Sequence, residues 1–172
     1  MNAAQRSSAL GAGLMRLAVA AAYCGGAVVA VIGLMSAISI IGRSVIGKPI
    51  IGDFELVEIG TAIAGSLFLP YCQATNGHII VDFFTLRAGE RTRSWLDRLG
   101  CLLMAAMFLV VGWRTITGAQ SIFRTGETSM LMGVPIWFGY AGMVPGIILA
   151  GLVALAQSFG VALGEAAGDD QG

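Results

Sequence analysis

The sequence predicts an all-α membrane protein with four transmembrane helices and a short interfacial segment between the second and third helices. Hydrophobic residues make up 56% of its 172 residues and charged residues only 12%, whereas a soluble domain carries about 25% charged residues. The apolar residues fall into four runs, which we place at 17–42, 53–75, 99–122 and 134–160. Each run reaches the roughly 20 residues that a membrane-spanning helix needs. The formal net charge of zero argues against nucleic acid as a partner.

The first predicted helix, 17–42, follows a polar segment, 1–16, that contains Arg6 and Arg16. A cleaved signal peptide is the alternative, but its apolar core has only about 7–15 residues. Within the helix, small residues recur at helical spacing, namely Gly26, Ala30, Gly33 and Ala37. Small side chains let another helix approach closely. The stripe is therefore a candidate packing face, and a helix that is merely rich in alanine and glycine is the alternative.

The second predicted helix, 53–75, should begin with Asp53 as its N-cap and Glu55 in its first turn, where the helix dipole favours negative charge. At about 100° per residue, small and polar residues share one face: Glu58, Thr61, Ala62, Gly65, Leu69 and Cys72. The opposite face is made of larger residues: Leu56, Ile59, Ile63, Leu67 and Pro70. We expect the first face to pack on protein and the second to face lipid.

The region 76–98 is the long polar interruption of the chain. Its basic residues are Arg87, Arg91, Arg93 and Arg98. Aromatic and apolar residues, including Trp95 and Leu96, alternate with them, which indicates a segment lying at the membrane surface. The arginines there contact lipid headgroups or form a protein docking site. Loops rich in arginine stay in the cytoplasm, so this region predicts that both termini are cytoplasmic, including the polar tail 161–172.

The third predicted helix contains Arg114, which we place in its outer part at a depth similar to that of Glu58. Arg114 either extends its charged group to the membrane surface or pairs with Glu58. The fourth helix opens with Pro135, and Trp137 and Tyr140 mark a membrane interface. Pro145 should kink this helix. A second small stripe consists of Gly139, Gly142, Gly146 and Ala150.

The chemistry-bearing residues are few. The single histidine, His78, cannot supply the two ligands of a bis-histidine haem, and no HExxH, CxxC or Walker pattern occurs. Cys24, Cys72 and Cys101 lie far apart within apolar runs, as small buried hydrophobes do. His78 and Asp82 are either a ligand pair or, more simply, partners in a local hydrogen bond. We therefore predict no catalytic, substrate-binding or metal-binding residues, and a scaffold or accessory subunit.

Three short motifs resemble the small membrane subunit of the tripartite ATP-independent periplasmic (TRAP) transporters. They are Glu55-Leu56-Val57-Glu58, then Gly77-His78-Ile79-Ile80-Val81-Asp82, and Gly126-Glu127-Thr128 followed by Pro135, Trp137, Tyr140 and Pro145. Together with the four runs, the resemblance covers nearly the whole chain. It implies a subunit of the bacterial inner membrane that binds no cofactor itself. A large multi-span partner carries the substrate and sodium sites, and a periplasmic binding protein delivers the substrate, often an organic acid.

The resemblance also implies roles for particular residues. The residues expected on the outer side and available to the binding protein are Arg43, Lys48, Arg124 and Glu127. Glu58 and Arg114 would stabilise this subunit or its contact with the large one, while Gly77, His78 and Asp82 would shape the inner turn. Two other classes of protein stay open: a membrane anchor of a respiratory enzyme and a small self-sufficient channel or exporter.

Overall fold

The computed structural model is built from long α-helices, and it describes residues 3–45, 47, 51–75 and 90–159. The helices in this part of the chain are α1 (Ala3–Val45), α2 (Asp53–Ala74), α4 (Glu90–Thr125) and α5 (Trp137–Ser158). Each is long and apolar enough to cross a membrane. The predicted all-α membrane class with four spans is thereby confirmed.

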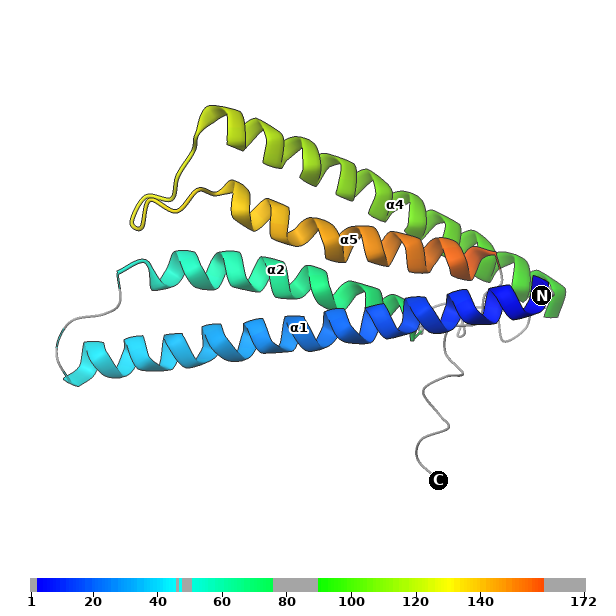
Figure 1. Cartoon of the computed structure of the whole chain (residues 1–172), viewed down its shortest axis with the longest axis horizontal. Coiled ribbons are helices and arrows are strands. Elements are labelled where there is room, and N and C mark those ends of the chain that lie inside the picture. Colours follow the sequence, from blue (N-terminus) through cyan, green and yellow to red (C-terminus); the bar gives the residue numbers. More distant parts are fainter. Residues whose placement is uncertain (1–2, 46, 48–50, 76–89, 160–172) are drawn as a thin grey trace, which may run out of the picture.

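The four helices lie side by side in the order α4, α5, α2, α1 (Figure 1), and each packs on the next. The last helix in the sequence therefore lies between α2 and α4. The helices converge toward the end where α1 begins and spread toward the opposite end (Figure 1). We call that opposite end the hairpin end, because the loop 126–136 joins α4 to α5 there.

The contact between α2 and α5 depends on the second small stripe. A Cβ atom added at Gly142 would lie 2.7 Å from the Cδ1 atom of Ile63, and one added at Gly146 would overlap the backbone carbonyl of Ser66. Pro70 has no N–H to donate to that carbonyl, so α5 approaches α2 at a turn where the helical hydrogen bond is missing. This stripe therefore packs on α2, and α5 continues as one helix through Pro145.

The contact between α1 and α2 repeats every seven residues. Ala18, Gly25 and Ser39 are buried, and Ile32 is half-buried at the intervening position. A Cβ at Gly25 would lie 3.2 Å from the carbonyl oxygen of Ala64. A seven-residue repeat of this kind keeps one seam of a helix against its partner.

The small stripe predicted on α1 lies beside this seam and faces outward. Gly26, Ala30, Gly33 and Ala37 are exposed, and a Cβ at Gly26 or Gly33 would meet no atom within 4 Å. No helix in the described part of the chain packs on this stripe, so it is not a packing face within the chain.

The two faces predicted for α2 are reversed within the chain. Ile59, Ile63 and Leu67 are half-buried and contact glycines of α5 and α1, whereas Glu58 and Gly65 are exposed. The physical reason is that the small residues sit on the neighbouring helices. Glycines on α5 and α1 leave room for the branched side chains of α2, so the bulky face of α2 packs inward.

Two helices are much longer than a membrane is thick. At 1.5 Å per residue, the 43 residues of α1 span about 64 Å and the 36 residues of α4 about 54 Å, against a hydrocarbon core of about 30 Å. Trp95 and Leu96, predicted in the interfacial segment, belong to α4. Residues 76–89 of that segment, including Gly77, His78 and Asp82, lie outside the described residues, as does the tail 161–172.

The close approach at Gly146 predicts a strong effect of a single methyl group. We expect Gly146→Ala to lower the free energy of unfolding by about 1–3 kcal/mol, because the backbone of α2 must shift. Gly151→Ala on the same helix is the control. Its Cβ would lie 3.5 Å from Phe108, an ordinary contact, so stability should stay equal or rise by up to about 1 kcal/mol. Thermal unfolding in detergent measures both variants, and equal stability of the two would contradict the packing described here.

Candidate functional site

Asp53 joins the start of α2 to the end of α1. Its carboxylate accepts hydrogen bonds from the Ser39 hydroxyl (2.6 Å) and from the backbone N–H of Phe54 (2.9 Å). The Arg43 guanidinium lies 3.8 Å from the same carboxylate. Gly52 takes the N-cap position and Asp53 is the first helical residue, so the predicted N-cap is wrong by one residue. Asp53 instead ties two helices together.

Glu55 joins the start of α2 to the loop between α4 and α5. Its carboxylate accepts hydrogen bonds from the Ser129 hydroxyl (2.6 Å) and from the backbone N–H groups of Leu131 (2.9 Å) and Met132 (3.1 Å). Hydrogen bonds to a charged acceptor are stronger than neutral ones. The sequence predicts only a favourable interaction with the helix dipole, because nothing local indicates a partner 74 residues away.

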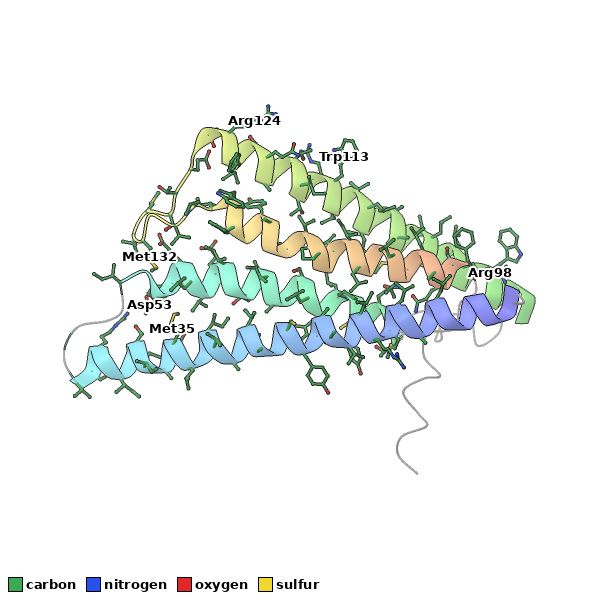
Figure 2. All side chains as sticks on the ribbon, in the orientation of Figure 1. Met35, Asp53, Arg98, Trp113, Arg124 and Met132 are labelled. Atoms are coloured by element: carbon green, nitrogen blue, oxygen red, sulfur yellow. The ribbon has the colours of Figure 1, made fainter. Side chains whose placement is uncertain are left out.

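Glycine at position 52 allows the loop between α4 and α5 to pack closely on the start of α2. Its φ of +81° is a left-handed conformation that favours glycine, and a Cβ there would overlap the Met132 side chain. Figure 2 shows Asp53 and Met132 together at the hairpin end. The first turn of α2, residues 52–55, therefore contacts both α1 and the α4–α5 loop.

The loop 126–136 is a short hairpin with its own hydrogen bonds. Ser129 N–H donates to the carbonyl of Val134 (2.8 Å), and Ile136 N–H donates to that of Glu127 (3.2 Å). Thr128 and Pro135 pair as an isolated β-bridge. Trp137 stacks on Phe138 and meets the ring of Phe123 edge-on, with ring centroids 5.5 Å apart. These contacts give the loop a defined shape.

Three of the four predicted docking residues lie at the hairpin end. Arg43 and Arg124 are exposed there, and Figure 2 shows Arg124 at the end of α4 that lies opposite Arg98. Glu127 is also exposed and accepts a hydrogen bond from the Thr125 hydroxyl (3.1 Å). Lys48 lies outside the described residues.

Glu58 and Arg114 are not paired in the described structure. Arg43–Asp53 is the one ion pair within 4.0 Å that the described residues form. Glu58 lies on α2 and Arg114 on α4, on either side of α5, and both side chains are exposed. The structure therefore does not bring these two charges into an ion pair.

A pair of glutamines ties α2 to α5 at the opposite end of the bundle. The Gln73 side-chain amide donates to the Oε1 atom of Gln157 (2.8 Å), and the Gln157 amide donates to the backbone carbonyl of Gln73 (2.9 Å). Gln73 is buried. This pair was not predicted from the sequence, although a glutamine within an apolar run is a signal that could have identified it.

These contacts define a class of protein: a helical membrane protein whose polar groups join its helices at both ends. Among the described residues, no group of three or more His, Cys, Asp or Glu side chains is placed to hold a metal ion.

The family model of the DctQ component of tripartite ATP-independent periplasmic transporters matches residues 31–164. The chain belongs to this family, and the predicted resemblance is confirmed. It is a small subunit of a TRAP transporter, and the family is a transporter component rather than an enzyme family. Comparison with curated proteins and with solved structures gave no significant match.

The Glu55 contacts predict that one substitution loosens the hairpin. In Glu55→Gln an N–H₂ group replaces one acceptor oxygen and faces hydrogen-bond donors. We expect amide hydrogen exchange at Leu131 and Met132 to become severalfold faster, because the loop opens locally more often. Glu127→Gln, in the same loop, should leave these rates unchanged. Unaltered exchange in Glu55→Gln would show that the carboxylate does not hold the loop.

Proposed function

We propose that this chain is the small scaffold subunit of a sodium-coupled, binding-protein-dependent secondary importer of organic acids. It pairs with a large multi-span subunit, which carries the substrate and sodium sites, in the bacterial inner membrane. Membership of the DctQ family supports this assignment. The sodium coupling, the organic acid substrate and the membrane are parts of the proposal that the family's name does not specify.

The observation that supports a scaffold role is the use of polar side chains within the bundle. Asp53 and Glu55 bond to α1 and to the α4–α5 loop, and Gln73 bonds to Gln157. A substrate path needs polar groups that are free to bind a solute. Here these polar groups join helices to one another, as expected of a rigid support for a moving partner.

The hairpin end is the proposed contact site for a periplasmic binding protein. The orientation follows from the basic residues, since the N-terminal segment and residues 76–98 contain six arginines and such segments stay in the cytoplasm. Both termini are then cytoplasmic, and the exposed Arg43 and Arg124 face the periplasm. Their positive charge suits an acidic patch on a soluble partner.

Reconstitution into proteoliposomes tests the proposed function. The three components are the tagged chain, the large TRAP membrane subunit of the same organism, and the binding protein, and the probe is a panel of radiolabelled mono- and dicarboxylates. Uptake should require all three components and an inward sodium gradient. Uptake without the small chain, or uptake that ignores the sodium gradient, would contradict the proposal.

The proposed contact site predicts a charge effect on transport. We expect Arg124→Glu and Arg43→Glu to lower the initial rate of uptake severalfold while membrane insertion stays unchanged, because each substitution replaces a positive charge at the docking surface. Arg124→Lys keeps the charge and should retain most of the rate. Arg124 gives the more direct test of docking, because Arg43 also lies beside Asp53 and its substitution removes that contact within the chain as well. Wild-type uptake by both Glu variants would rule out this surface as the docking site of the binding protein.

A further inference from the structure

A groove runs between α2 and α4, with α5 as its floor. Its volume is about 350 Å³. Residues of all three helices line this α2–α4 groove, among them Thr61, Ala62, Gly65, Met107, Val111 and Ile147. It exists because α5 separates α2 from α4 (Figure 1). The groove opens on the side of the bundle, where lipid or a partner protein lies in a membrane.

The walls of the groove suit another helix. On α2, Ala62 and Gly65 are small, and a Cβ at Gly65 would meet no atom within 4 Å. Small residues of this kind let a second backbone approach closely. The opposite wall and the floor contribute Met104, Met107 and Met143, whose unbranched side chains adapt to an irregular partner.

Two charged side chains flank the groove toward the hairpin end. Glu58 precedes Thr61 by three residues and Gly65 by seven, so it shares their face of α2. Arg114 follows Val111 by three residues and Met107 by seven, which places it on the same side of α4. Both are exposed, and neither forms an ion pair with another described residue.

An unpaired charge within a membrane-spanning helix is costly and normally meets a partner. Lipid tails cannot supply that partner, and a headgroup phosphate would attract Arg114 but repel Glu58, so one lipid phosphate does not satisfy both charges. A protein helix can supply complementary groups and also fill the groove. The charges therefore favour a protein occupant over a lipid.

We propose that the α2–α4 groove receives one transmembrane helix of the large TRAP subunit. That helix carries a basic side chain opposite Glu58 and an acidic or hydrogen-bond-accepting side chain opposite Arg114. The inference rests on the proposed function, because it names where this subunit meets its large partner. The outward small stripe on α1, from Gly26 to Ala37, has no such flanking pair of charges and is the natural comparison surface.

Two matched leucine substitutions test the proposal. Gly65→Leu fills the groove, and Gly33→Leu adds the same side chain to the outward face of α1; a Cβ at either position meets no atom within 4 Å, so both variants should fold. The tagged chain is co-expressed with the large TRAP subunit of its own organism, and recovery of the complex is measured. We expect Gly65→Leu to recover about tenfold less large subunit than wild type, and Gly33→Leu to match wild type.

A photo-crosslinker at Thr61 provides a second measurement that needs no disruptive variant. It should form an adduct with the large subunit, while a crosslinker at Gly33 should not. The charge requirement is tested with Glu58→Lys, which should lower recovery more than Glu58→Gln.

Each outcome is decisive. Normal recovery with Gly65→Leu, equal losses for both leucine variants, or crosslinking from Gly33 alone would overturn the groove as the docking site. Normal recovery with loss of a co-purifying phospholipid from Gly65→Leu would show that lipid fills the groove instead. If the wild-type chain recovers no large subunit, the proposed function itself fails, which distinguishes that failure from failure of the groove.

Discussion

The close approach of α5 to α2 determines where the other helices of the bundle can pack. Gly146 sits against the backbone carbonyl of Ser66, where any larger residue would force the two helices apart. In a membrane, helices associate through such packing because lipid tails are as apolar as the side chains. With α5 held there, α1 occupies the other side of α2, and α4 packs mainly on α5. The groove between α2 and α4 is a direct consequence.

Polar contacts fix the ends of this arrangement. At the hairpin end, Asp53 and Glu55 connect the first turn of α2 to α1 and to the α4–α5 loop. At the other end, Gln73 and Gln157 connect α2 to α5. Polar groups in a membrane favour internal partners, because lipid offers none. Packing therefore sets which helices meet, and these contacts set their register. A rigid unit of this kind fits the support role that we propose beside a moving transport subunit.

The sequence predicts the number of helices, the class and the family well, because length, apolarity and short motifs carry that information directly. The packing faces were harder to predict. Most of α1 is apolar around its whole circumference, so periodicity could not reveal that the seam runs through Gly25 rather than Gly26. The bulky face of α2 packs inward rather than toward lipid, because its side chains fill the space left by glycines on other helices. The partners of Glu55 lie 74 to 77 residues away, and only the fold brings them together.

If α5 keeps α2 and α4 apart and thereby leaves room for a partner helix, the distance between α2 and α4 should not depend on whether the partner is present. Spin-label spectroscopy can measure this distance. Spin labels are placed at Thr61 and Val111 in a chain that lacks Cys24, Cys72 and Cys101, and the distance is measured in lipid nanodiscs with and without the large subunit. We expect the same distance in both samples, with less mobile labels when the partner is bound. A shorter distance in the chain alone, from α4 closing onto α2, would contradict it.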